Sequence, residues 1–149
     1  MFDRSSLLTD IIYKNPGLHF CEVIRVSGMK NGVLTHYLNK LELSGIININ
    51  RERDKTRFFS PEISLEEIKI IKFLRKETSR KILFSLINGG MEYHEIVKKV
   101  GKSSPTISQN LSELSNNDLI IFKLEDSKKK YFIKKNSLLQ KLIKKYQFY

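Results

Sequence analysis

The chain has 149 residues, of which 40% are hydrophobic and 29% charged, and it carries a formal net charge of +11. Its single cysteine, Cys21, excludes an internal disulfide framework and a zinc site made of several cysteines. No apolar run reaches the roughly 18 to 20 residues that span a bilayer, and the acidic Asp3 is untypical of a secretory signal. We therefore expect a cytoplasmic protein with no membrane partner.

The charge is unevenly distributed along the chain. Residues 1–67 hold 9 basic and 9 acidic side chains, whereas residues 68–149 hold 18 basic and 7 acidic ones. A charge of this size on half of a small protein favours a polyanionic partner, nucleic acid first. A surface of solvated lysines is the alternative interpretation.

The two halves are related by an internal repeat. A shift of 73 residues aligns residues 18–59 with residues 91–132 without a gap, and Gly28 then meets Gly101. Apolar positions coincide along the alignment while polar positions vary, which indicates two copies of one fold.

Each copy contains the same predicted elements in the same order. An apolar helix comes first, followed by a short extended segment, a second helix that ends at Gly28 or Gly101, and a third helix, which together form a helix-turn-helix. Two runs of strand-forming residues around a charged tip then predict a β-hairpin, or wing. The apolar residues of the first helices are Leu7, Leu8, Ile11 and Ile12 in one copy and Ile82, Leu83, Leu86 and Ile87 in the other.

The sequence therefore predicts a mainly α protein with small β-hairpin wings, made of two tandem winged helix-turn-helix domains. We place the first domain at residues 1–62, a connecting helix at 63–77, and the second domain, with a C-terminal amphipathic helix, at 78–149. Ser64 and Glu67 have the spacing of a capping box at the start of the connecting helix. The connecting helix could dock the two domains or pair with another subunit, and the C-terminal helix could pack on its own domain or form a homodimer.

The third helices, at about 31–43 and 104–116, are the predicted recognition helices of a major-groove reader. Leucine and isoleucine at helical spacing place one face of each helix in the core. The opposite faces begin without a carboxylate and carry polar groups that can reach base edges and phosphates. These candidate DNA-binding residues are Asn31, Thr35, His36, Asn39 and Lys40 in the first copy and Ser103, Ser104, Thr106, Ser108, Gln109 and Ser112 in the second.

The wing tips are basic, which suits contacts to the DNA backbone. Intervening acidic residues reduce this benefit, so some tip side chains must point away. The candidate wing residues are Arg51, Arg53, Lys55, Arg57, Lys128, Lys129 and Lys130.

No enzyme, cofactor or metal site is predicted. Residues 101–103 resemble the end of a phosphate-binding loop, but Ile96 stands where that loop needs a glycine. His19, His36 and His94 are too far apart in the two copies to share a metal ion.

Residues 78–135 resemble the winged helix of the ArsR family of bacterial and archaeal repressors, in "TSRKILFSLINGG" and "VGKSSPTISQNLSEL". The whole chain is similar to tandem winged-helix regulators common in archaea. Metal-responsive ArsR members carry cysteines on the second helix or Asp and His ligands on the last one. The second helix of the second copy, "YHEIVKKV", has no cysteine, and the last helix, "SLLQKLIKKYQFY", has no His, Asp or Glu, so we expect no metal sensing. Cys21, near the start of a second helix, is either an incidental small residue or a site of redox chemistry, as a redox switch or an intersubunit disulfide.

We thus expect a sequence-specific regulator of transcription that binds double-stranded DNA. Two alternatives stay open. One is a protein-interaction module of the transcription machinery, which the neutral first half suits. The other is a sequence-neutral architectural DNA binder, which the lysine-rich second half permits.

Overall fold

The computed structural model describes residues 3–53 and 55–148. The chain forms two compact units, Met1–Ile68 and Lys69–Tyr149. The division falls within the segment 63–77 that was expected to be a connecting helix, and the finer domain limits stay a prediction. None of the helices in the described part of the chain has the length and hydropathy that crossing a membrane requires.

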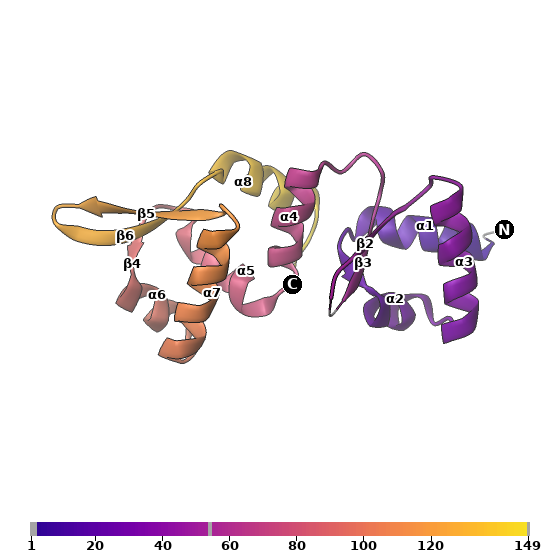
Figure 1. Cartoon of the computed structure of the whole chain (residues 1–149), viewed down its shortest axis with the longest axis horizontal. Helices are drawn as coiled ribbons and strands as arrows, with labels where there is room; N and C mark the ends of the chain where they lie inside the picture. The colour runs from indigo at the N-terminus through magenta and orange to yellow at the C-terminus, as the bar shows by residue number, and fades with distance from the viewer. Residues whose placement is uncertain (1–2, 54, 149) are drawn as a thin grey trace. The chain divides into compact units, whose positions relative to one another are not determined.

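Unit 1 (Met1–Ile68) contains a helix-turn-helix followed by a short wing (Figure 1). Its three strands form an antiparallel sheet in the order β1-β3-β2, so that β3 is the middle strand. Leu8, Ile12, Val23, Leu34 and Phe58 are buried together in its core, whereas Leu7 is 38% exposed. The elements are α1 (Arg4–Lys14), β1 (Leu18–His19), α2 (Phe20–Ser27), α3 (Asn31–Leu43), β2 (Asn48–Arg51) and β3 (Thr56–Phe59).

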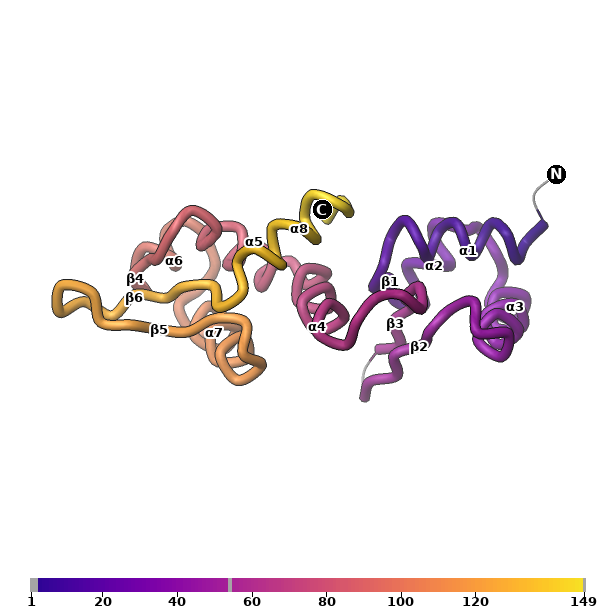
Figure 2. The backbone as a smooth tube through the Cα atoms, turned by 90° about the horizontal axis from the view of Figure 1, so that it is seen from above, coloured from indigo at the N-terminus to yellow at the C-terminus, as the bar shows by residue number. Residues whose placement is uncertain are grey.

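Unit 2 (Lys69–Tyr149) repeats this arrangement, with strand order β4-β6-β5 and a longer wing. The β5–β6 hairpin projects beyond the helices of its unit (Figure 2). Asp126 and Ser127 at its tip have φ of 53° and 65°, as a two-residue hairpin turn requires. The elements are α4 (Leu65–Leu74), which begins in unit 1, α5 (Glu77–Leu86), β4 (Met91–Glu92), α6 (Tyr93–Val100), α7 (Ser104–Asn116), β5 (Ile120–Glu125), β6 (Lys128–Ile133) and α8 (Asn136–Lys145).

The turn of each helix-turn-helix is made by a glycine in the left-handed region. Gly28 ends α2 with φ of 70°, and Gly101 ends α6 with φ of 75°. Such a residue is usually glycine because a Cβ atom is strained there. The chain then starts α3 at Asn31 and α7 at Ser104, so the predicted third helices, 31–43 and about 104–116, are confirmed.

The apolar faces of α4 and α8 are covered within one chain. The predicted capping box is present, because the Glu67 N–H donates to Ser64 Oγ at 3.1 Å and the Ser64 N–H donates to the Glu67 carboxylate at 2.9 Å. Ile71 and Leu74 of α4 are fully buried, as are the α8 residues Leu139 and Leu142. A homodimer through either helix stays a prediction, and it would have to use the more exposed side chains.

Candidate nucleic-acid interface

The polar face of α7 is held in place by contacts beneath it. Ile107, Leu111 and Leu114 are buried in the core of unit 2. The Ser79 hydroxyl donates to Asn110 Oδ1 at 3.0 Å, and the Tyr93 hydroxyl donates to the Ser104 carbonyl at 2.7 Å. These contacts join α7 to α5 and α6 and fix which side chains the helix presents to solvent.

Five of the six predicted residues of this face are exposed: Ser103, Ser104, Ser108, Gln109 and Ser112. Ser103 and Thr106 also serve the start of the helix. Ser103 is the N-cap, and its Oγ lies 2.8 Å from the hydroxyl of Thr106, which is half-buried. Ser103 and Thr106 are therefore partly occupied in capping, which satisfies an otherwise unpaired N–H.

The five predicted residues of α3 are all exposed: Asn31, Thr35, His36, Asn39 and Lys40. The Thr35 hydroxyl donates back to the Asn31 carbonyl at 2.9 Å, which leaves its methyl group and its two acceptor lone pairs for an external contact. The face is thus composed of amide, hydroxyl, imidazole and ammonium groups at the surface.

Each predicted recognition helix also carries one glutamate that helical periodicity did not single out. Glu113 of α7 is exposed. Glu42 of α3 accepts two hydrogen bonds from the Arg51 guanidinium, at 2.7 and 2.8 Å, and this interaction lowers the pKa of the Glu42 carboxyl. A pair that joins a helix to a strand nine residues later has no periodic signal in the sequence.

One predicted wing residue, Arg57, requires correction. It was expected at an exposed tip but is only 2% exposed, and its Nη1 donates to the Gly17 carbonyl at 2.6 Å. The reason is its place on β3, the middle strand, where it pairs in register with His19 of β1. Arg51, Arg53 and Lys55 are exposed, although Arg51 is held by Glu42.

The three wing lysines of unit 2 have different surroundings. Lys128 Nζ lies 3.7 Å from the Glu92 carboxylate, and Lys130 Nζ lies 3.2 Å from the Glu125 carboxylate, which raises the pKa of Lys130. Lys129 projects from the other face of the hairpin, and its Nζ lies 4.1 Å from the centre of the Phe122 ring. Of these three lysines, Lys129 is therefore the one for which the described residues show no ion pair with a carboxylate.

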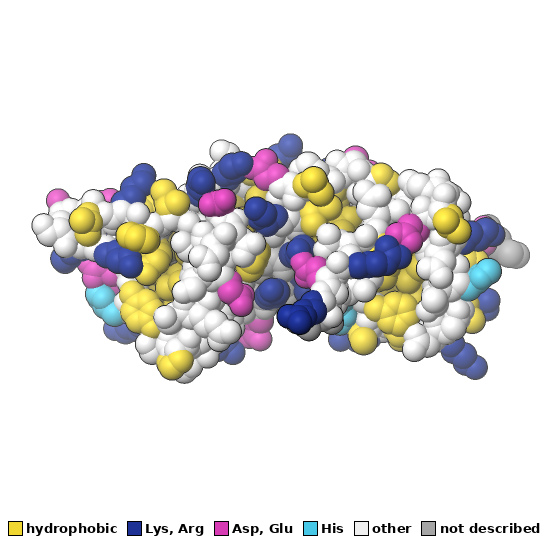
Figure 3. Space-filling view, viewed as in Figure 1, with side chains coloured by type: hydrophobic (Ala, Val, Ile, Leu, Met, Phe, Trp, Pro, Cys, Tyr) yellow, Lys and Arg dark blue, Asp and Glu magenta, His cyan; other side chains and the backbone are white. Residues whose placement is uncertain are grey.

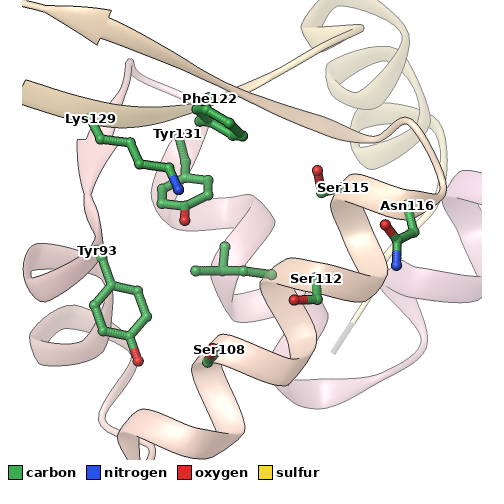
Figure 4. A pocket seen from close by; sticks show the side chains of 9 residues that line it. Tyr93, Ser108, Ser112, Ser115, Asn116, Phe122, Lys129 and Tyr131 are labelled. Atoms are coloured by element: carbon green, nitrogen blue, oxygen red, sulfur yellow. The ribbon is translucent and has the colours of Figure 1, made fainter.

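A groove lies between the third helix and the wing in each unit. In unit 2, side chains from α7 face Phe122, Lys129 and Tyr131 of the wing across this groove (Figure 4). The unit 2 groove is lined by Tyr93, Ser108, Leu111, Ser112, Ser115, Asn116, Phe122, Lys129 and Tyr131. The unit 1 groove is lined by Phe20, Asn31, Thr35, Leu38, Asn39, Ile49, Arg51, Thr56 and Phe58. Most of these positions are equivalent after the shift of 73 residues.

Basic side chains do not gather into one patch on the face seen in Figure 3, where they lie singly among polar and hydrophobic atoms. Phe122 and Leu124 add exposed apolar surface to the wing of unit 2, with 55% and 77% exposure. The candidate interface is thus a polar helix beside a mixed apolar and cationic hairpin.

Glu92, His94 and Glu95 bring ligand atoms within 4.8 Å of one another at the start of α6. Their contacts are those of a helix cap. The Glu92 N–H donates to the Glu95 carboxylate at 3.1 Å, and the Glu92 carboxylate pairs with His94 and Lys128. The contacts of these groups within the chain are thus those of a helix cap and its ion pairs. Cys21 is exposed on the first turn of α2, and a redox role stays a prediction.

Residues 76–121, from the start of α5 to the start of β5, match the family model described as bacterial regulatory protein, arsR family. No match is found among curated proteins.

Three solved structures are similar to the chain. The homodimeric winged helix-turn-helix DNA-binding domain of a possible ArsR-family transcriptional regulator from Mycobacterium bovis is 22% identical, with 53% of this chain and 75% of that chain covered and a TM-score of 0.46. HlyU from Vibrio cholerae is 18% identical, with 55% and 89% covered and a TM-score of 0.48. The transcriptional repressor BigR from Xylella fastidiosa is 14% identical, with 78% and 92% covered and a TM-score of 0.46.

Proposed function

We propose that the chain is a transcription regulator that binds double-stranded DNA in a sequence-specific manner, with α7 in the major groove. The observation that carries this proposal is the exposed face of α7. Ser104, Ser108, Gln109 and Ser112 stand in a row of hydroxyl and amide groups on a helix fixed from below. Such groups donate to and accept from base edges and phosphates.

The charge of unit 2 supports the same proposal. Its 18 basic and 7 acidic side chains give a net +11, whereas unit 1 is neutral. A unit with this charge attracts a polyanion and releases counterions on binding. The match of residues 76–121 to an arsR-family model adds a DNA-binding precedent for this unit.

The test is selection of bound sequences from random duplex DNA at about 150 mM salt, a near-physiological ionic strength. The wild type is compared with a Gln109→Glu, Ser112→Glu double variant, which places two carboxylates on the exposed face of α7. Thr106 is left unchanged because it takes part in the cap. Gln147→Glu is the control, since Gln147 is exposed in the same unit but lies outside α7.

A defined motif that the wild type and the control share, and that the double variant loses, is the expected result. Binding of all duplexes alike would replace the regulator with an architectural binder. No binding to DNA, together with co-purification of polymerase subunits, would replace it with a module of the transcription machinery.

A further inference from the structure

The equivalent grooves of the two units differ in their charged groups. In unit 1, Arg51 lines the groove and is bonded to Glu42. The equivalent residues in unit 2, 73 positions later, are Leu124 and Ser115, neither of which is charged. At another pair of equivalent positions, unit 2 has the charged Lys129 where unit 1 has the uncharged Thr56.

The Glu42–Arg51 ion pair has the two-point geometry that favours persistence at a protein surface. Both guanidinium nitrogens of Arg51 reach the carboxylate, at 2.7 and 2.8 Å. Isolated surface ion pairs contribute little, but the bidentate pairing of arginine with a carboxylate is the geometry that contributes most. Because the pKa of Glu42 is lowered by Arg51, the carboxylate is charged at neutral pH, and the pair has no net charge.

Lys129 presents its charge to the unit 2 groove without such a partner. Its Nζ lies 4.1 Å from the centre of the Phe122 ring and 5.4 Å from the centre of the Tyr131 ring. Aromatic rings orient a cation without neutralising it. No ion pair joins Lys129 to a carboxylate within residues 3–53 and 55–148, and the Ser115 hydroxyl lines the same groove.

We propose that the Glu42–Arg51 ion pair excludes DNA phosphate from the groove of unit 1, while the groove of unit 2 binds a backbone phosphate at Lys129. A phosphate that approaches Arg51 meets a guanidinium whose charge is already neutralised by Glu42, and the Glu42 carboxylate beside it repels the phosphate. Unit 1 therefore contributes no phosphate contact through this groove. The inference rests on the proposed DNA binding.

The experiment measures how the dissociation constant for one duplex depends on salt between about 50 and 200 mM, where each phosphate contact adds about 0.9 to the slope. Glu42→Gln keeps the size of the side chain but removes the charge that holds Arg51. We expect tighter binding and a slope steeper by about 0.9. Glu62→Gln is the matched control, because it removes one negative charge from an exposed site of the same unit that does not line the groove.

The reciprocal variant, Ser115→Glu, adds to unit 2 the carboxylate that unit 1 has at the equivalent position. We expect weaker binding and a slope shallower by about 0.9. A thermal melt shows whether Ser115→Glu is folded. If it is not, Lys129→Gln replaces it, and we expect Lys129→Gln to weaken binding and make the slope shallower by about 0.9 as well.

The inference is overturned if Glu42→Gln changes the slope no more than Glu62→Gln does, or if Lys129→Gln leaves the slope unchanged. In both cases the wild type still binds DNA, so the proposed function stands. If the wild type binds no duplex at all, the proposed function fails and the inference fails with it.

Discussion

Arg57 and Lys130 occupy equivalent positions in the two copies, and both lie on the middle strand of a three-stranded sheet. Arg57 stands opposite His19 of β1, and Lys130 stands opposite Glu92 of β4. Arg57 has strand neighbours on both sides, His19 and Asn50, and Lys130 likewise lies between Glu92 and Lys123. Arg57 reaches the Gly17 carbonyl, and Lys130 reaches Glu125. At this position of the wing, a basic residue forms contacts within its own sheet, and for Lys130 a contact to DNA stays a prediction.

Arg57→Ala should therefore destabilise the protein. Hydrogen bonds from charged donors contribute about 1.5 to 3 kcal/mol, and the change also leaves the buried Gly17 carbonyl without this donor. We expect the free energy of unfolding in urea to fall by about 2 kcal/mol. Arg53→Ala is the control, because Arg53 is exposed on the same wing. Equal stability of the two variants would show that the buried hydrogen bond contributes nothing.

His19 gives unit 1 a dependence on pH. Burial lowers the pKa of His19 below the ordinary value of 6.5, and Glu22 opposes this shift only in part. His19 therefore binds a proton more readily in the unfolded chain than in the folded one. Its contribution to the free energy of unfolding is fully present above pH 6.5 and is lost as the pH falls through the lowered pKa.

The measurement is urea unfolding between pH 7.5 and about 5, a range that brackets the histidine titration. The free energy of unfolding should decrease across it in the wild type. His19→Asn, which keeps a helix-capping group, should flatten the curve. A wild-type curve that is flat, or that rises as the pH falls, would contradict the assignment.

At the scale of elements, the turn between α6 and α7 depends on Gly101. Its φ of 75° suits glycine, and a Cβ atom added there would meet no other atom within 4 Å, so strain in the backbone is the main cost of substitution. Gly101→Ala should lower the free energy of unfolding by about 1 to 2 kcal/mol. Gly32→Ala, within α3 and equally free of contacts, should raise it by up to about 1 kcal/mol, because alanine favours helices. Chemical denaturation of both variants distinguishes a strained turn from a general effect of alanine.

The helices and hairpins could be predicted from the sequence because their signals are local. Leucine or isoleucine at every third or fourth residue defines α3 and α7, and the two copies support each other through the repeat. The surroundings of the wing side chains could not be predicted in this way. Whether Arg57 is buried depends on β1, a strand of only two residues that pairs with β3 across about 40 positions of sequence.

The candidate interface could be predicted from the sequence only in part. The exposed faces of α3 and α7 follow from the positions of the buried leucines and isoleucines, so the polar residues opposite them were found. The Glu42–Arg51 ion pair could not be predicted from the sequence, because it depends on how the end of α3 meets the wing strand β2. The sequence shows that both residues are present, but not that they neutralise each other.

At the scale of the whole molecule, the two units repeat one fold with different electrostatics. Unit 1 has no net charge, and in it Glu42 is paired with Arg51 of the wing. Unit 2 holds the whole net charge of +11. Equivalent substitutions should therefore have unequal effects on DNA binding. Asn39 and Ser112 provide the comparison, since they are 73 residues apart, exposed, and on the same face of α3 and α7.

Ser112→Glu should weaken binding to duplex DNA by about tenfold, which corresponds to about 1.4 kcal/mol. Asn39→Glu should weaken it by less than about threefold, because α3 lies in a unit whose field does not attract the DNA backbone. Fluorescence anisotropy at one fixed salt concentration measures both, and thermal melts confirm that both variants are folded. Equal losses would show that the two units share the DNA, despite their difference in charge. A larger loss for Asn39→Glu would instead make unit 1 the main DNA-binding unit, with the charge of unit 2 serving another polyanion or a solvated surface.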